Sequence, residues 1–137
     1  MSEPSYEDLE YLDINVATKD FKPREELIQK GAFRASLSDV RKMLSDFPDV
    51  TFFKGWIPQT FIQSRSVEYK FVHIDVDLFE PTLRSLEYFW PRLISGGIII
   101  SDDYAWNGAE RAIKLFSKKE SVPFHVSNYG QAFLVKP

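Results

Sequence analysis

Two pairs of aspartates give the sequence its clearest chemical signal. Asp75 and Asp77 close one apolar run, and Asp102 and Asp103 directly follow another. Ligands of open α/β sheets bind at the carboxyl ends of the strands, so we expect these four carboxylates to converge on one edge. Like charges held that close repel one another unless a proton or a cation neutralises them. Oxygen ligands without sulfur suit a hard cation such as Mg²⁺, Mn²⁺ or Ca²⁺.

Aspartates that follow a strand have a second common role, which is to cap the next helix. Asp77 could cap a helix that contains Pro81, and Asp103 could cap a later helix that begins near Gly108. One such aspartate would fit either role. Two pairs at successive strand ends favour a binding site over capping.

The elements that must position these aspartates alternate between strand and helix. Apolar periodicity and turn residues predict helices over 36–47, from Pro81 to Trp90 and over 108–118, and strands over 50–53, 69–75, 98–101, 123–126 and 131–135. We interpret Gly96 and Gly97 as a turn that leads into the third of these strands. Alternating strands and helices indicate an α/β fold, a three-layer Rossmann-like and mostly parallel sheet. Asn128-Tyr129-Gly130 predicts a C-terminal hairpin that adds one antiparallel strand at an edge.

Composition limits the classes of function. The formal net charge is −3 over 137 residues, which argues against nucleic-acid binding. The chain has no cysteine, so thiolate metal sites and disulfides are excluded. No apolar run is long enough to span a membrane, and the acidic first ten residues do not resemble a signal peptide. We therefore expect no membrane partner and a cytoplasmic protein. Residues 1–35 show no steady period and are interpreted as an irregular arm or lid before an α/β domain over 36–137.

Three segments together resemble the macrocin O-methyltransferase (TylF-like) family. They are VTFFKGWIPQT at 50–60, FVHIDVDLFEPT at 71–82 and WPRLISGGIIISDDY at 90–104. The resemblance implies a class I methyltransferase fold with sheet order 3-2-1-4-5-7-6 and an antiparallel seventh strand. It also implies S-adenosylmethionine as methyl donor, Mg²⁺ or a similar divalent cation, and a small-molecule acceptor, namely a natural-product sugar or aromatic hydroxyl.

The resemblance also assigns roles to residues. It implies Asp75, Asp102 and Asp103 as metal ligands. Asp75 and Asp77 are implied as the catalytic carboxylates beside the reacting hydroxyl. Gly55 and Trp56, near the family's third strand, are implied in cofactor binding.

The chain departs from the family at its beginning. The glycine-rich donor turn and the first two strands are not found, so we interpret the sequence as the C-terminal half of the fold, which could be inactive alone. Strand 69–75 would then expose an apolar edge, which predicts a homodimer or pairing with another chain. An inward shift of the third strand would also cover that edge.

Three alternatives remain open from the sequence. The chain could be a non-catalytic fragment or partner subunit of a methyltransferase. An Asp-x-Asp phosphatase is a second alternative, although Phe79 stands where that class has threonine. A metal-dependent glycosyltransferase is the third.

Overall fold

The computed structural model describes residues 35–64 and 67–137. Nearly all of the predicted arm, 1–35, lies outside these residues. In the described part the element order is α2 (Leu37–Met43), the 3₁₀ turn η2 (Gln59–Gln63), β1 (Tyr69–Ile74), α3 (Phe79–Phe89), η3 (Trp90–Arg92), β2 (Leu93–Ser101), α4 (Asn107–Glu120), β3 (Phe124–Val126) and β4 (Ala132–Val135). None of the helices in these two ranges is both long and apolar enough to cross a membrane.

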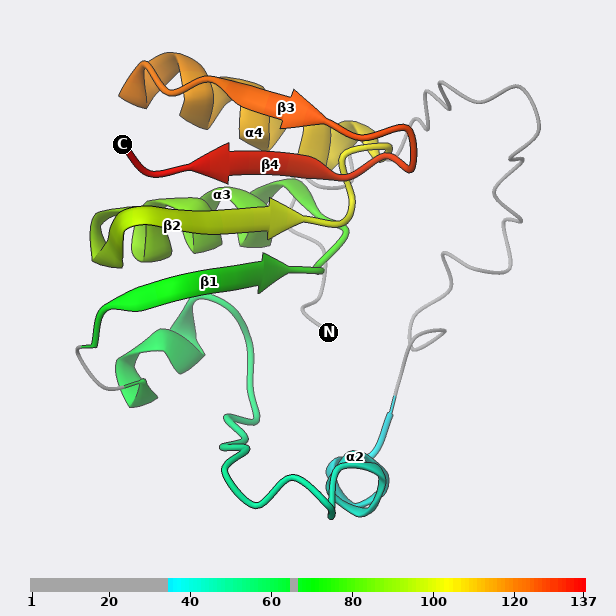
Figure 1. The fold of residues 1–137 in the computed structure, drawn as a ribbon. Helices are drawn as coiled ribbons and strands as arrows, with labels where there is room; N and C mark the ends of the chain where they lie inside the picture. Colours follow the sequence, from blue (N-terminus) through cyan, green and yellow to red (C-terminus); the bar gives the residue numbers. More distant parts are fainter. Residues whose placement is uncertain (1–34, 65–66) are drawn as a thin grey trace.

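The four strands form one mixed sheet in the order β1-β2-β4-β3 (Figure 1). β1 pairs with β2 in parallel, while β4 pairs with both β2 and β3 in antiparallel fashion. Three strands therefore run in the same direction and β4 runs against them. The predicted α/β class and C-terminal hairpin are confirmed, and the third layer of the predicted three-layer sheet stays a prediction. The antiparallel strand was predicted to lie at an edge of the sheet. This prediction is wrong, because β4 lies inside the sheet and β3 forms the edge beyond it.

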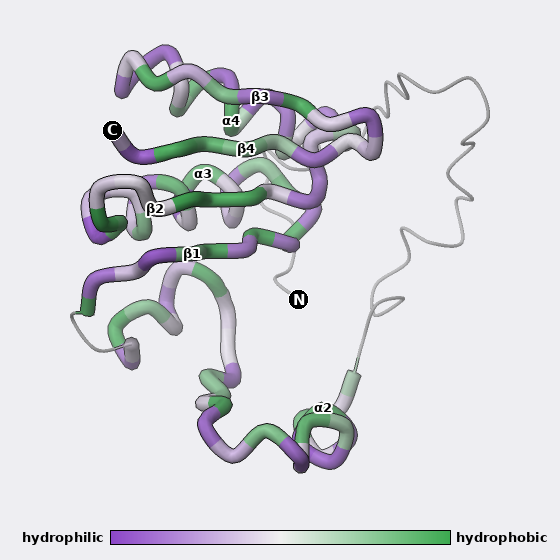
Figure 2. The backbone as a smooth tube through the Cα atoms, in the orientation of Figure 1, coloured by the Kyte–Doolittle hydropathy of each residue, from purple (hydrophilic) through white to green (hydrophobic). Residues whose placement is uncertain are grey.

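Helices α3 and α4 lie together behind the sheet, against the same face (Figure 1). Strand residues alternate, so every second side chain points to these helices. The buried strand residues include Val72, Ile74, Ile99 and Leu134, and the buried helix residues packed with them include Leu86, Ile113 and Phe116. The two inner strands, β2 and β4, are correspondingly hydrophobic over much of their length (Figure 2). This core holds the carboxyl ends of β1 and β2 side by side.

The two helices also approach closely at their first turns. A Cβ atom on Gly108 would lie 2.9 Å from the backbone nitrogen of Phe79, so only glycine fits there without movement. At their other ends Glu87 and Lys119 form an ion pair of 2.9 Å. Because both helices follow sheet strands directly, this close approach fixes the loops after β1 and β2 relative to each other.

Two sequence predictions need correction. Residues 50–53 form no strand, and no sheet partner for them occurs in the described ranges, so an apolar run alone did not make a strand. The second concerns β2, which begins at Leu93 rather than at Ile98. Its pairing with β1 shifts register between Tyr69 and Phe71, and the two glycines lie inside the strand. Gly96 has φ +74°, and a Cβ on Gly97 would lie 2.8 Å from a backbone oxygen.

The first predicted helix is confirmed but shorter. Ser36 caps α2, since its Oγ accepts a hydrogen bond of 3.1 Å from the Asp39 backbone. The helix ends at Met43, which is 79% exposed, and no residue of α2 is fully buried.

Candidate metal and active site

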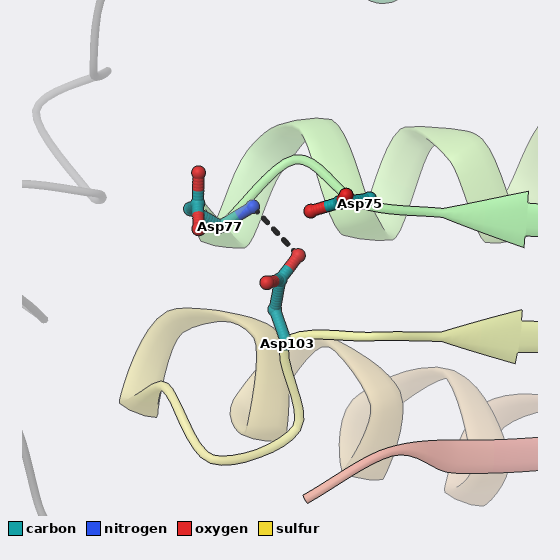
Figure 3. A group of neighbouring side chains, drawn as sticks. All are labelled: Asp75, Asp77 and Asp103. Atoms are coloured by element: carbon teal, nitrogen blue, oxygen red, sulfur yellow. Dashed lines mark hydrogen bonds between the residues drawn. The ribbon is translucent and has the colours of Figure 1, made fainter. Parts of the chain in front are cut away.

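Three carboxylates meet where β1 and β2 end (Figure 3). Asp75 and Asp77 follow β1, and Asp103 follows β2. One oxygen from each lies within 4.8 Å of the others. Asp75 is exposed, Asp77 is half-buried and Asp103 is buried. Because β1 and β2 are parallel neighbours, the convergence predicted for these three residues from the sequence is confirmed.

Asp103 organises the loop that carries the other two. Its Oδ2 accepts hydrogen bonds of 2.9 Å from the backbone nitrogens of both Val76 and Asp77. Asp77 has φ +60°, a conformation that non-glycine residues seldom adopt. Charge-assisted bonds from one carboxylate thus help to hold the loop in this conformation.

Neither helix is capped by these aspartates. The N-cap positions of α3 and α4 are Leu78 and Trp106, and neither makes a side-chain capping bond. The capping interpretation of Asp77 and Asp103 is therefore wrong. Both carboxylates instead face the cluster between the strands.

The crowding raises the pKa of two of the carboxyls. Burial, with the charges of Asp77 and Asp75 adding to it, raises the pKa of Asp103 from 3.8 to about 6, although the two backbone N–H groups oppose the change. Burial and the neighbouring Asp75 raise the pKa of Asp77 as well. A positive charge placed among the carboxylates would lower the pKa of both Asp77 and Asp103. The donor set consists only of oxygen and carries excess negative charge, so these residues fit a hard divalent cation.

Asp102 points elsewhere. Along β2, Ile99, Ser101 and Asp103 are buried on the helix side, so Asp102 alternates to the opposite side. Its Oδ1 accepts a hydrogen bond of 2.6 Å from the Gln131 side-chain nitrogen and lies 3.7 Å from His73 Nε2. The structure does not bring Asp102 into the group formed by the other three. Its role as a metal ligand stays a prediction.

Gln131 is a site neighbour that the sequence analysis missed. The antiparallel register pairs Ser101 with Ala132, so extending it by one residue places Asp102 opposite Gln131. The polar residue just before the last strand was the available signal. Its position beside Asp102 depends on the register between β2 and β4, which pairs residues far apart in the sequence.

The two residues expected to bind cofactor lie in the loop before η2. Gly55 has φ +154°, and a Cβ there would come within 2.7 Å of the Thr60 side chain. Trp56 is 46% exposed, and its backbone oxygen accepts a hydrogen bond of 2.8 Å from Thr60. The loop is thus built around a glycine and leaves the indole ring accessible. Donor binding by these residues stays a prediction.

Comparison with known proteins identifies the family. The family model described as macrocin-O-methyltransferase (TylF) matches residues 5–131. The chain belongs to the macrocin O-methyltransferase family. The match begins well before residue 50, where the first of the three resembling segments starts. It favours a methyltransferase over the phosphatase and glycosyltransferase alternatives.

Two individual O-methyltransferases are also similar to this chain. The chain is 36% identical over 64 residues to the 8-demethyl-8-(2,3-dimethoxy-alpha-L-rhamnosyl)-tetracenomycin-C 4'-O-methyltransferase of Streptomyces olivaceus, which covers 47% of this chain and 24% of the relative. The structure of the O-methyltransferase NovP superimposes with a TM-score of 0.68 at 18% identity, covering 92% of this chain and 57% of NovP. At that identity the likeness shows the fold. The chain thus spans about a quarter of the Streptomyces olivaceus enzyme and somewhat over half of NovP.

Proposed function

We propose that this chain forms the metal- and acceptor-binding part of an S-adenosylmethionine-dependent O-methyltransferase that acts on a natural-product hydroxyl. The observation that carries the proposal is the cluster of Asp75, Asp77 and Asp103 at two strand ends, in a member of the macrocin O-methyltransferase family. The relative from Streptomyces olivaceus is named for methylation of a rhamnosyl group, which favours a sugar hydroxyl over an aromatic one as the acceptor.

The carboxylates suit the chemistry of hydroxyl methylation. The metal ligands that the family resemblance implies, Asp75, Asp102 and Asp103, would hold a divalent cation, which would supply Lewis-acid polarisation of the acceptor hydroxyl. Asp77 or Asp75 would accept the proton that the hydroxyl loses. The remaining task of the protein is to align the oxygen with the methyl group of the donor.

The strand order supports a specific place for this chain in the methyltransferase sheet. The family resemblance implies the sheet order 3-2-1-4-5-7-6. The observed order β1-β2-β4-β3, with β4 antiparallel, matches its last four positions, 4-5-7-6. We assign β1 to β4 to strands four to seven. The glycine-rich donor turn of the family belongs to the first strand, which is not among these four.

Binding of the methyl donor can be followed through the fluorescence of the exposed Trp56 indole. S-adenosylmethionine titrated into the chain with Mg²⁺ present should quench the fluorescence of Trp56, and Trp56→Phe should lose most of that change. Binding that leaves the fluorescence unaltered would remove Trp56 from the donor site. Calorimetry that finds no binding at millimolar donor would contradict donor binding by this chain and support the non-catalytic alternative.

We also propose that β1 pairs with a second copy of the chain. Within the described residues β1 has a strand neighbour on one side only, and its Phe71 is 56% exposed. Such an edge is prone to pair with another strand. Sedimentation should show a dimer that Phe71→Asp weakens, while Met43→Asp, which alters a more exposed apolar side chain on α2, leaves it intact. A monomeric chain at high concentration would contradict the pairing.

A further inference from the structure

The face of the sheet that points away from α3 and α4 is apolar. The strand register lines up Phe71 of β1, Ile98 of β2 and Val135 of β4 in one row, and all three side chains are exposed. The next row on the same face pairs Ile100 with Phe133. We call these five residues the open face. A contiguous exposed apolar patch typically marks a surface that packs against another element, so the open face indicates an interaction site.

Helix α2 carries an apolar stripe of matching size. Leu37, Val40 and Leu44 recur at intervals of three and four residues, so their side chains lie on one side of the helix. No residue of α2 is buried, and the helix lies well apart from the sheet (Figure 1). A helix of seven residues is too short to be stable in water by itself and depends on the packing of its apolar side. The stripe therefore indicates a partner that the described part of one chain does not provide.

We propose that the stripe of α2 docks on the open face of a second copy of the chain, in a reciprocal two-fold dimer. A helix with its side chains is about 10 Å across and neighbouring strands lie about 4.8 Å apart, so one helix covers the three strands of the open face. Each contact occurs twice about a two-fold axis, which doubles the apolar area that the dimer buries. The contact differs from the pairing at β1, which would join backbone groups at the sheet edge rather than side chains on the sheet face.

The route of the chain favours a second copy over the α2 of the same copy. Between α2 and β1 the chain is anchored at η2, where the Phe61 ring stacks on Tyr88 of α3 at 4.4 Å between centroids and the Ser64 and Tyr88 hydroxyls lie 2.6 Å apart. Because α3 covers the other face of the sheet (Figure 1), this anchor brings the chain to β1 from the covered side. The α2 of the same copy would have to pass around the β1 edge to reach the open face.

Disulfide cross-linking tests the contact in the full chain, which has no cysteine of its own. Val40→Cys and Val135→Cys should form a covalent dimer when the two variants are mixed and oxidised, because each supplies one half of the contact. Neither variant should cross-link alone. Lys42→Cys, on the opposite side of α2, is the matched control and should not cross-link with Val135→Cys. A mixture that gives no covalent dimer, or one that cross-links equally with Lys42→Cys, would overturn the proposal.

Sedimentation measures how much the stripe contributes to the dimer. Val40→Asp places a charge on the apolar contact and should raise the dissociation constant at least about tenfold. The variant should still fold, because α2 buries no residue, and Lys42→Asp on the opposite side should leave the dissociation constant nearly unchanged.

The outcomes separate this docking from the other proposals. A dimer that Val40→Asp leaves intact would overturn docking by α2 without contradicting the pairing at β1. A disulfide within one chain, in the double variant Val40→Cys/Val135→Cys, would show that α2 docks on its own sheet and would overturn the second copy as partner. A chain that stays monomeric at high concentration would overturn both contacts. None of these results bears on the metal site, which is tested by its own titration.

Discussion

Replacing Asp103 by asparagine should stabilise the metal-free chain at neutral pH. The folded-state pKa of Asp103 is raised to about 6, from 3.8 as the ordinary value. A carboxyl with a raised pKa contributes most to stability below about pH 3.8, and that contribution is lost as the pH rises through 6. The substituted asparagine would stay neutral throughout, and its side-chain oxygen can still accept the hydrogen bonds from Val76 and Asp77.

The magnitude follows from the pKa difference. From 3.8 to about 6, at about 1.4 kcal/mol per pKa unit, the ionised Asp103 costs at most about 3 kcal/mol of unfolding free energy. Asp103 is only 5% exposed, so solvent does little to reduce this cost. The difference in unfolding free energy between Asp103→Asn and the unsubstituted chain should be small near pH 4, and should approach this limit above pH 7.

Urea denaturation between pH 4 and pH 8, with a chelator present, measures this difference directly. Asp46→Asn makes the same change on an exposed loop after α2 and serves as the matched control. Excess Mg²⁺ should then stabilise the unsubstituted chain but not Asp103→Asn, which narrows the gap. A difference that fails to grow with pH, or that grows in the opposite direction, would refute the reasoning about crowded carboxylates.

Two further predictions concern the framework of the site. Gly108→Ala should cost about 1–3 kcal/mol of unfolding free energy, because its Cβ would press on the Phe79 backbone at 2.9 Å; an unchanged urea midpoint would show that the helices separate freely. Phe116→Ala should cost about 3–5 kcal/mol of unfolding free energy, because the Phe116 ring is buried and its centroid lies 5.8 Å from that of Trp90. Thermal unfolding measures this cost. A loss of stability under about 1 kcal/mol would mean that the core refills the cavity.

Much of the fold was predictable because its elements carry strong local signals. The run that became β1, the apolar stripes of α3 and α4 and the turn at Gly130 each specified an element. The run at 50–53 has equally apolar residues but forms no strand, since a strand depends on partners that local sequence does not show. The glycines inside β2 were interpreted as a turn, because the register shift that accommodates them depends on pairing with β1.

The candidate site was predictable to the same degree. Asp75, Asp77 and Asp103 were expected together, because parallel neighbours end at one edge. Alternation along β2 separates Asp102 from Asp103, which a pair of adjacent letters does not reveal. The contact between Asp102 and Gln131 joins residues 29 positions apart. It required the register of β4, so no local pattern could have indicated it.

The central claim is that the strand-end aspartates bind a divalent cation for methyl transfer. Calorimetric titration of Mg²⁺ into the purified chain, compared with Asp75→Asn and the Asp46→Asn control, tests it most directly. We predict one ion per chain, lost in Asp75→Asn and retained in Asp46→Asn. No binding, or binding that Asp75→Asn leaves unchanged, would contradict the account.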